Sequence, residues 1–512
     1  MRIRLAGKLS NLWTLVIIAG LLSGCVRGMN GAGQSPFSFG QKSQLALVET
    51  VTTGEEQSER VSTRVAPPQI TPTPKESPTP APPILYYTQA GDTLSALAAR
   101  FGVAREEISS TQSLPENGLL DPGILLIIPD KLGETTSSEQ VMPDSEIVFS
   151  PSALDFDINK YVTEAGGYLT TIQEWHSNGW NSGAASVYKV AIDNSINPRL
   201  LLAILEYQSH WVTGQPENLA QTDFPVGYLN YQKKGLFAQL SWAVQQLNIG
   251  YYGWREGRLT SLTFQDGTTM RLAPDLNAGS VAVLYLFSQL YDQPHWAAAV
   301  YGLESMPALY EKMFGSPWLR AQSVEPLFPA TLTQPPMELP FRPGKPWSLT
   351  GGPHSAWGPD GARAALDFAP STTEKDCYVS TDWVTAISSG LVVRSEYGVV
   401  VVDLDGDGFE QTGWAVLYLH IATNDRVPVN TWVNTDDRIG HPSCEGGQAT
   451  GTHVHVARKY NGEWILADGP MPFVLSGWRA VAGEKPYQGA LIKEEKTVKA
   501  SIYGDYSSLI SR

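Results

Sequence analysis

The chain has 512 residues and a formal net charge of −15 at pH 7, with 36 Lys and Arg residues against 51 Asp and Glu residues. This length accommodates several domains of ordinary size. Phosphate binding needs clustered Lys and Arg, and no basic block follows the first residues of the chain, so nucleic acid is not expected as a partner.

The N-terminus has the pattern of an export signal. Residues 1–8 are basic, and residues 12–22 form an apolar run too short to span a bilayer as a mature helix. The run ends in Leu-Ser-Gly before Cys25, which resembles the bacterial lipoprotein cleavage box. This resemblance implies removal of residues 1–24 and a lipidated Cys25 that anchors an exported protein to the outer face of a bacterial membrane. The alternative is an ordinary secretory signal with an incidental cysteine.

Residues 25–83 are predicted to form a disordered tether. They are rich in Gly, Gln, Pro, Ser and Thr, and residues 71–83 are dominated by Pro and Thr. Such a composition buries little apolar surface and stays extended. We therefore expect the tether to give the folded domains reach away from the membrane.

Residues 84–131 predict a small folded unit. A strand begins at Tyr87, and a Gly turn with an Asp or Thr cap leads into an amphipathic helix that has Leu94, Leu97, Ala98 and Phe101 on one face. An apolar run at residues 125–129 predicts a closing strand. This pattern resembles a LysM module with a βααβ fold, although Gln112 stands where such modules often have Asn.

The resemblance to LysM implies binding of glycans that contain N-acetylglucosamine, such as peptidoglycan. The loops that flank the first helix usually make the contacts in these modules. The corresponding candidate residues here are Gly91, Asp92, Thr93 and Leu94. A small packing domain without a glycan ligand is the alternative.

Residues 155–330 predict a helical, tryptophan-rich, all-α domain. Residues 197–211 begin with Asn-Pro and continue as a mostly apolar helix. This helix resembles the signature helix of lytic transglycosylases and goose-type lysozymes, which needs a protonated Glu where this chain has Gln208. A carboxamide cannot protonate a glycosidic oxygen, and Glu206 lies about 200° around the helix. We expect a catalytically inactive lysozyme-like domain, which either holds glycan or acts as a spacer.

Residues 335–485 predict a mainly antiparallel β domain, entered through a Pro-rich linker at residues 331–345 and followed by a C-terminal tail at residues 486–512. Alternating short apolar runs separated by turn residues indicate the strands. Residues 403–408, Asp-Leu-Asp-Gly-Asp-Gly, superficially suggest a calcium loop. Trp414 stands where such a loop needs a Glu, so a hairpin turn is favoured.

The same domain contains a candidate metal site. His453 and His455 lie two positions apart in a β-rich run, so both rings share one face of a strand. His354, Asp367 and His420 precede them. Two neutral imidazoles and one carboxylate form an ordinary three-ligand set for catalytic zinc, which leaves a fourth position for water. The alternative is that these histidines are ordinary packed or surface residues. It accounts for the pair His453 and His455 but not for all five residues together.

Residues 340–485 resemble the lysostaphin-type metallopeptidases, a family of peptidoglycan endopeptidases. The resemblance implies one Zn²⁺ held by His354, Asp367 and His455, with His420 and His453 orienting water and stabilising the transition state. Twelve residues separate His354 from Asp367. Most members of the family have a shorter spacing, and the long one resembles the staphylolysin-like branch. Asp360 is therefore a competing ligand.

Cys377 and Cys444 are the two cysteines that remain after Cys25, and both fall inside the β domain. In an exported chain such a pair is most simply a disulfide. Thiolate ligation of zinc is the rival interpretation, but the histidines and Asp367 already complete a ligand set.

The sequence thus favours a lipid-anchored zinc endopeptidase that faces the cell wall and hydrolyses peptide stems or cross-bridges of peptidoglycan. A non-catalytic scaffold that binds peptidoglycan, or an activator of a separate wall amidase, is the alternative. A glycan-cleaving enzyme in the helical domain is disfavoured by Gln208.

Overall fold

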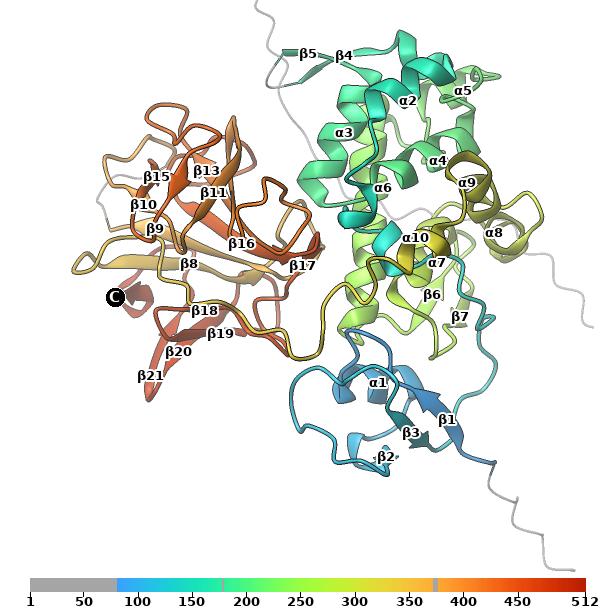
Figure 1. Ribbon diagram of the computed structural model, residues 1–512, viewed down its shortest axis with the longest axis horizontal. Coiled ribbons are helices and arrows are strands. Elements are labelled where there is room, and N and C mark those ends of the chain that lie inside the picture. Colours follow the sequence, from blue (N-terminus) through green and yellow to red (C-terminus); the bar gives the residue numbers. More distant parts are fainter. Residues whose placement is uncertain (1–80, 177–178, 372–375) are drawn as a thin grey trace, which may run out of the picture. The chain divides into compact units, whose positions relative to one another are not determined.

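The computed structural model describes residues 81–176, 179–371 and 376–512, all of which belong to one compact unit, Pro78–Arg512 (Figure 1). The predicted signal, Cys25 and nearly all of the tether lie outside the described residues. None of the helices in the described ranges combines the length and the apolar character needed to cross a bilayer.

The N-terminal module contains a three-stranded antiparallel sheet in the order β1-β3-β2. Its elements are β1 (Ile84–Tyr87), α1 (Leu94–Phe101), the 3₁₀ turn η1 (Arg105–Glu107), β2 (Ser109–Ser110) and β3 (Leu125–Ile128). Thr93 caps α1, and Gly102 ends it in the left-handed conformation. The expected second α-helix is replaced by η1 and β2, because Ser and Thr side chains compete for backbone partners. The Ser110 hydroxyl, for example, donates to the Leu125 carbonyl at 2.8 Å.

The middle domain is helical, as expected, but two β-hairpins interrupt it, so it is not all-α. Its long elements are α2 (Ile158–Ala165), α3 (Gly183–Asn194), α4 (Pro198–Ser209), α6 (Leu236–Arg255), α7 (Ala278–Ser288), α8 (Gln293–Tyr301) and α9 (Met306–Phe314). Its short elements are η2 (Asp144–Glu146), η3 (Pro151–Ala153), η4 (Tyr168–Thr171), α5 (Leu219–Asp223), η5 (Tyr231–Lys233) and α10 (Pro317–Ala321). The hairpins are β4 (Gln173–His176) with β5 (Gly179–Ser182), and β6 (Ser261–Thr263) with β7 (Thr269–Arg271).

Helix α4 shows how local sequence sets these boundaries. The Asn197 side chain caps it, Pro198 occupies its first turn, and His210 ends it at φ 55°. Leu200 to Leu205 are all fully buried in the core of the domain. A helix that is apolar around its whole circumference is buried on every side, as the sequence predicts.

The C-terminal region is built on a large antiparallel sheet of nine strands in the order β14-β11-β12-β13-β16-β9-β8-β22, with β17 paired to β16. These strands are β8 (Trp347–His354), β9 (Ala365–Pro370), β11 (Gly390–Glu396), β12 (Gly398–Asp403), β13 (Trp414–Ile421), β14 (Trp432–Val433), β16 (Val454–Tyr460), β17 (Glu463–Trp464) and β22 (Leu509–Ile510). Two further strands, β10 (Val384–Thr385) and β15 (Arg438–Gly440), form a separate pair.

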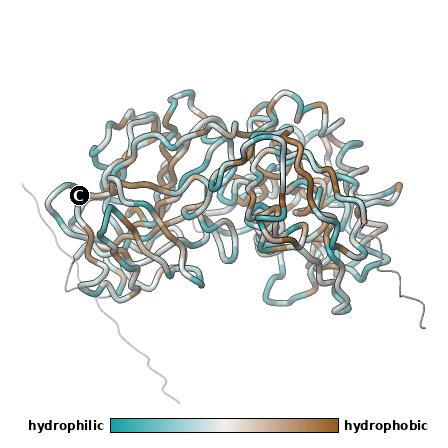
Figure 2. Tube along the Cα trace, turned by 90° about the horizontal axis from the view of Figure 1, so that it is seen from below, coloured by the Kyte–Doolittle hydropathy of each residue, from teal (hydrophilic) through white to brown (hydrophobic). Residues whose placement is uncertain are grey.

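The central strands β12, β13 and β16 are buried on both faces, which explains the nearly continuous apolar sequence of β12 and β13. Strand β16 instead carries His455, Arg458 and Lys459 in buried positions. Figure 2 shows such apolar stretches running through the inner segments, with hydrophilic loops around them. Val454 and Val456 point into the core of this domain, as predicted from the alternation with His453 and His455.

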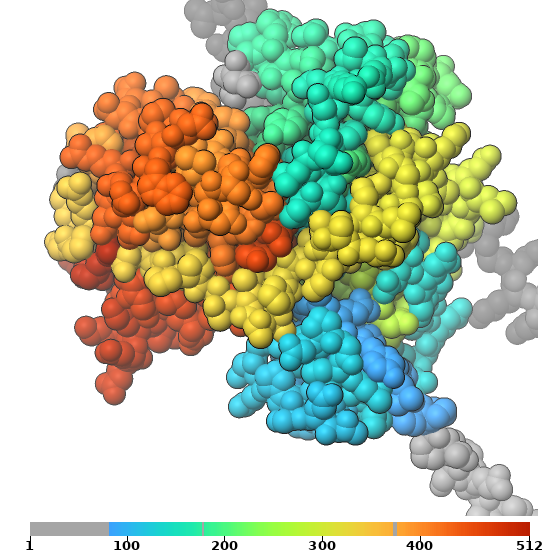
Figure 3. All heavy atoms as spheres, viewed as in Figure 1, coloured from blue at the N-terminus to red at the C-terminus, as the bar shows by residue number. Residues whose placement is uncertain are grey.

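Residues 486–512 are folded rather than a tail. They form β20 (Gly489–Lys493), β21 (Lys496–Lys499), the 3₁₀ turn η6 (Tyr506–Ser508) and β22. Strands β20 and β21 extend a four-stranded sheet that begins with β18 (Val474–Leu475) and β19 (Trp478–Ala482), whereas β22 pairs with β8. The domain therefore continues to the last residues, whose atoms appear red in Figure 3.

Buried ion pairs join the helical domain to the β domain. The Arg394 guanidinium contacts Asp193 at 2.6 Å and Glu410 at 2.9 Å, and the Lys459 ammonium contacts Glu410 at 2.7 Å. All four side chains are less than a tenth exposed. Because Asp193 lies on α3 and the other three lie in the β domain, the pairing depends on both domains being folded.

Candidate active site

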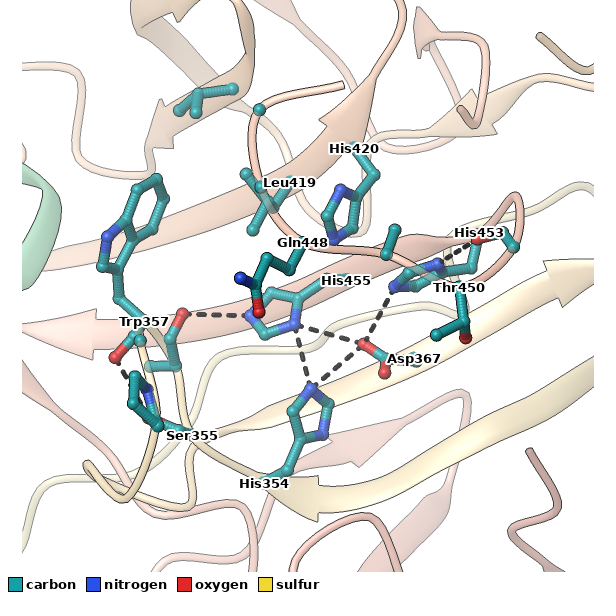
Figure 4. Close-up of a pocket in the computed structure, with 18 of the residues that line it drawn as sticks. His354, Ser355, Trp357, Asp367, Leu419, His420, Gln448, Thr450, His453 and His455 are labelled. Atoms are coloured by element: carbon teal, nitrogen blue, oxygen red, sulfur yellow. Dashed lines mark hydrogen bonds and ion pairs between the residues drawn. The ribbon is translucent and has the colours of Figure 1, made fainter. Parts of the chain in front are cut away.

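Three neighbouring strands bring together the residues predicted to bind metal. His354 ends β8, Asp367 lies in the middle of β9, and His455 lies on β16. The register places His455 directly opposite Asp367, and Asp367 opposite Gly351 on the other side. Figure 4 shows the two rings and the carboxylate pointing toward one another.

The inward-facing atoms of these three residues converge closely. His354 Nε2 lies 3.0 Å from His455 Nδ1, and each of these nitrogens lies 3.2 Å from Asp367 Oδ1. All three side chains are buried. Asp360 takes no part in this group, so the long spacing after His354 is accommodated and Asp367 is the carboxylate of the cluster.

In each ring, the nitrogen that points away from the cluster, here called the outer nitrogen, indicates where the proton lies. His354 Nδ1 faces the Gly352 carbonyl at 2.8 Å, and His455 Nε2 faces the Ala356 carbonyl at 3.0 Å. A carbonyl oxygen only accepts hydrogen bonds, so each outer nitrogen carries a proton, and in the neutral ring each inner nitrogen is a lone pair. Three lone pairs therefore meet without a donor, and Asp367 Oδ1 is a buried atom without a hydrogen-bond partner.

This donor set fits a zinc ion. Ligand atoms about 2.1 Å from a tetrahedral zinc lie about 3.4 Å from one another, close to the separations seen here. Protein carbonyls that orient ligating histidines through the second ring nitrogen are usual at such sites. His354, Asp367 and His455 would hold the ion.

The electrostatics of the cluster follow from burial and mutual charge. Burial alone would raise the pKa of Asp367, but His354 and His453 outweigh it and lower that pKa well below its usual value. Burial would lower the pKa of His354, but the Asp367 carboxylate outweighs it and raises that pKa. For His455, burial dominates and lowers the pKa. The cluster thus keeps an ionised carboxylate in a buried position.

His420 and His453 lie beside the cluster, as predicted. Their ring centroids are 4.4 Å apart, and His453 Nε2 lies 3.8 Å from Asp367 Oδ1. His420 Nδ1 donates to the Glu445 carbonyl at 3.0 Å, and His453 Nδ1 donates to the Gly451 carbonyl at 2.8 Å. In its neutral form each ring therefore presents Nε2 as a hydrogen-bond acceptor. Burial, reinforced by the neighbouring histidines, lowers the pKa of His420 to about 3.

A β-bulge directs the His420 side chain. Val399 pairs with Leu419 and Gly398 pairs with Ile421, so His420 is the extra residue on β13. Its φ is 68°, in the left-handed region that a non-glycine residue rarely adopts. Such a conformation costs on the order of 1–3 kcal/mol and is concentrated at functional sites.

The disulfide predicted between Cys377 and Cys444 is present. Cys444 follows Ser443, whose backbone N–H donates to the His420 carbonyl, and precedes Glu445, whose carbonyl accepts from the His420 ring. The disulfide therefore fixes the loop that orients His420, and thiolate ligation of zinc is excluded for these two cysteines.

Sequence reasoning missed Tyr487 and Trp357. The Tyr487 ring stacks on His354 with centroids 4.1 Å apart, and both Tyr487 and Trp357 line the cleft at the metal cluster (Figure 4 labels Trp357). Tyr487 lies in the segment that was expected to be a tail, so no motif identified it. Trp357 lies in the long insertion between His354 and Asp367, which has no regular pattern.

The residues predicted to bind glycan in the N-terminal module divide into two groups. Gly91, Thr93 and Leu94 line a second cleft, of about 320 Å³. Asp92 is only 1% exposed and pairs with Arg100 at 2.7 Å, while the Tyr86 hydroxyl donates to it at 2.7 Å. Its side chain is therefore structural rather than available to a glycan.

The helical domain has no catalytic carboxylate at the predicted position. Gln208 Oε1 accepts from the Tyr291 hydroxyl at 2.8 Å. Glu206 is buried, and its carboxylate accepts from the backbone N–H groups of Val212 and Thr213 at 2.8 and 2.9 Å. Glu206 therefore holds the turn that follows α4 and does not replace the missing acid.

Similarity to known proteins was found for both large domains. The model of the LasA N-terminal domain family matches residues 140–328. Protease LasA of Pseudomonas aeruginosa (strain UCBPP-PA14) is 29% identical over 298 residues, which cover 54% of this chain and 65% of that protein. The β-lytic metalloendopeptidase of Lysobacter enzymogenes is 26% identical over 153 residues, which cover 30% of this chain and 82% of that protein.

Solved structures resemble only part of this chain. The M23 metalloprotease pseudoalterin from the deep sea is 23% identical, covers 36% of this chain and 99% of its own, and has a TM-score of 0.28. The catalytic domain of the antimicrobial peptidase lysostaphin from Staphylococcus simulans is 21% identical, covers 24% of this chain and 87% of its own, and has a TM-score of 0.18.

The aligned part of this chain spans slightly less than two thirds of the length of Protease LasA. The match at residues 140–328 shows that the helical region is similar to the LasA N-terminal domain, and its likeness to lysozyme stays a prediction. The sequence matches agree with what the histidine and aspartate motifs indicate: this chain is similar to metallopeptidases of the lysostaphin type.

Proposed function

We propose that this protein is a zinc-dependent endopeptidase that hydrolyses peptide bonds in the stems or cross-bridges of peptidoglycan, and that a lipidated Cys25 holds it at a bacterial membrane facing the wall. One observation carries the proposal. Three buried lone pairs, on His354 Nε2, His455 Nδ1 and Asp367 Oδ1, face one another within 3.2 Å without a proton donor. A cation removes the repulsion that this arrangement would otherwise suffer.

When bound there, zinc supplies Lewis-acid polarisation of a carbonyl and makes a water molecule more acidic. The chain supplies the proton handling. His453 Nε2 is an acceptor close to the ionised Asp367, whose charge stabilises the imidazolium that forms when His453 takes a proton. His453 can then return that proton to the leaving amine.

His420 has a different role in this mechanism. Its pKa of about 3 keeps the ring neutral at the pH of a cell wall, so Nε2 accepts a hydrogen bond from the attacking water and orients it. The hydrogen bond from His420 Nδ1 to Glu445 and the left-handed backbone hold the ring in place. His420 therefore orients the water, and His453 moves the proton.

Digestion of purified peptidoglycan by the full chain tests the proposal. Mass spectrometry of the released fragments is expected to show new amino and carboxyl termini within the peptides, and to identify which bond is cut. His455→Ala is the matched inactive variant, with circular dichroism to verify folding. Cleavage only in the presence of a separate amidase would favour the activator alternative. New reducing ends without peptide cleavage would place the activity in the helical domain and contradict the proposal.

A further inference from the structure

An exposed pair of tryptophans lies on the hairpin β4–β5 of the helical domain. Trp175 and Trp180 are cross-strand partners with ring centroids 5.7 Å apart in an edge-to-face arrangement. Trp175 is 66% exposed and Trp180 is 70% exposed. Burial of a large aromatic ring is strongly favourable, so two rings left in water on one short hairpin indicate a surface that meets a ligand.

The other face of the hairpin is anchored, so the tryptophans are held in position. The Glu174 carboxylate accepts from the backbone N–H groups of Leu236 and Phe237, at 2.8 and 3.0 Å, at the start of α6. His176 Nε2 lies 3.2 Å from the Ser186 hydroxyl. Since side chains alternate along a strand, this anchoring turns Trp175 to the opposite side.

The two tryptophans line the same cleft as the metal cluster. This cleft has a volume of about 2130 Å³ and is lined by Trp175 and Trp180 as well as His354, His420 and His455. Pockets for drug-sized ligands measure roughly 300–1,000 Å³. The cleft is therefore large enough for a polymer segment that extends well beyond a single peptide bond at the cluster.

The C-terminal segment adds aromatic rings to the lining of this cleft. Tyr503 and Tyr506 are 88% and 94% exposed, and both line it. Tyr506 begins η6, which leads directly into β22 at the edge of the large sheet. Exposed rings from two separate parts of the chain are thus available to one ligand.

The charges near the hairpin favour a neutral ligand. Of the three lysines that line the cleft, Lys189 is paired with Asp193 at 2.7 Å and with Glu396 at 3.0 Å, and Lys234 is paired with Asp223 at 2.9 Å. The third, Lys233, has no ion pair among the described residues, but the lining also contains more carboxylates than lysines. Ammonium groups that are already paired offer little attraction to a polyanion. Aromatic faces surrounded by polar, neutralised groups suit pyranose rings, which have apolar C–H faces and hydroxyl edges. N-acetylated sugars add an amide that can bond to polar groups at the rim.

We infer that Trp175 and Trp180 form a saccharide-stacking subsite that binds the glycan strand attached to the peptide cut at the metal cluster. The link to the cut peptide rests on the proposed function, whereas saccharide binding does not. Stacking of the sugar backbone beside the cleft would hold the attached peptide near the catalytic residues and raise the local concentration of scissile bonds. The specificity of the enzyme would then include the sugar chain as well as the peptide.

Binding of a β-1,4-linked N-acetylglucosamine hexamer to the full chain provides the first test. Residues 84–131, the LysM-like module, contain no tryptophan, but Trp464 lines the second cleft beside Gly91, Thr93 and Leu94, so calorimetric titration of each variant is used to measure hexamer binding. The double variant Trp175→Ala/Trp180→Ala is expected to lose about tenfold in affinity for the hairpin site in this calorimetric titration. The variant Trp175→Tyr/Trp180→Tyr, which keeps two aromatic rings, is expected to regain most of the binding.

Tyr231→Ala is the matched control, because Tyr231 is 86% exposed on the same domain but does not line the cleft. It is expected to bind the hexamer like the unaltered chain. Circular dichroism checks that each variant is folded. Unchanged hexamer binding in the alanine double variant, or an equal loss in Tyr231→Ala, would overturn the inference. So would a calorimetric signal with vesicles of phosphatidylethanolamine and phosphatidylglycerol but none with sugar, since that would indicate a membrane-binding surface.

A kinetic comparison connects the subsite to hydrolysis. The ratio of kcat/KM on a peptide that carries a disaccharide to kcat/KM on the free peptide is expected to fall about tenfold in the alanine double variant, through KM, and to stay constant in Tyr231→Ala. An unchanged ratio would contradict a role of the subsite in catalysis. If no peptide is cleaved by any form of the protein, the proposed function fails, while the hexamer titration still decides the saccharide site.

Discussion

His453 lies just before strand β16 and His455 lies within it, two positions apart in the chain, yet the structure assigns them different chemistry. His455 contributes a lone pair to the converging ligand set, whereas His453 Nε2 stands 3.8 Å from Asp367 Oδ1 at the side of it. The hydrogen bonds made by the opposite ring nitrogens decide the difference. One ring is locked by the Ala356 carbonyl and the other by the Gly451 carbonyl.

This difference predicts opposite outcomes for two alanine variants. His455→Ala is expected to lose bound zinc and all hydrolysis, while His453→Ala is expected to retain zinc and to lose about 10²–10⁴-fold in kcat. Metal analysis and steady-state kinetics on the same preparations measure both effects. His441→Ala is the control, because the His441 ring donates to the Asp382 carbonyl and stacks on Trp383 outside the cluster. Equal loss of zinc in both cluster variants would refute the assignment of His453.

At the scale of elements, the loop that carries Cys444 supports β13 at its bulge. Closing a loop with a sequence separation of 67 residues contributes on the order of 4 kcal/mol by the chain-entropy estimate. Cys444→Ser is expected to lower the unfolding midpoint and to reduce kcat more than zinc content, because His420 loses a fixed carbonyl partner. Calorimetry and metal analysis test this expectation. Unchanged kcat in a clearly destabilised variant would show that the loop does not orient His420.

The buried ion pairs between α3 and the large sheet are a second element-scale feature. Glu410→Gln would leave Arg394 and Lys459 without their shared carboxylate in a buried position, and is expected to cost about 3–5 kcal/mol of unfolding free energy. Glu396→Gln is the control, because Glu396 is 38% exposed and its pair with Lys189 is worth about 1 kcal/mol or less. Denaturant unfolding compares the two variants, and similar costs would contradict a special role for the buried network.

The same network predicts a pH dependence. Burial alone would raise the pKa of Glu410, but Arg394 and Lys459 outweigh it and lower that pKa. A carboxyl with a lowered folded-state pKa stabilises the protein fully above its unfolded value of about 4.3, and this contribution is lost as the pH falls through the folded value. Thermal unfolding between pH 6 and pH 3 is therefore expected to show a smaller acid-induced decrease for Glu410→Gln than for the unaltered chain. Parallel curves would count against this explanation.

At the scale of the whole molecule, the sequence predicted the features that local pattern determines. The H-x-H run on a strand, the ligand set, the disulfide and the helical middle region were all predicted, because strand alternation and helix periodicity are visible in short windows. The match of residues 140–328 to the LasA N-terminal domain agrees with this organisation, and so does the large antiparallel sheet observed in the C-terminal region.

What the sequence did not predict depends on distant partners. Strands β20 and β21 are short and end in charged residues, so their local signal is weak, and β22 is held by β8 from far along the chain. Asp92 was expected at a glycan-binding loop, but Arg100 pairs with it in the core of the N-terminal module. The gathering of Trp175 and Trp180 at the metal cleft likewise follows from tertiary structure.

The central claim is that one zinc ion binds to His354, Asp367 and His455. The most direct measurement is the zinc content of the purified full chain beside that of Asp367→Ala, with both forms verified as folded by circular dichroism. We predict one equivalent of zinc in the unaltered chain and almost none in Asp367→Ala. A folded, unaltered chain that takes up no zinc, or an Asp367→Ala variant that keeps a full equivalent, would contradict the account.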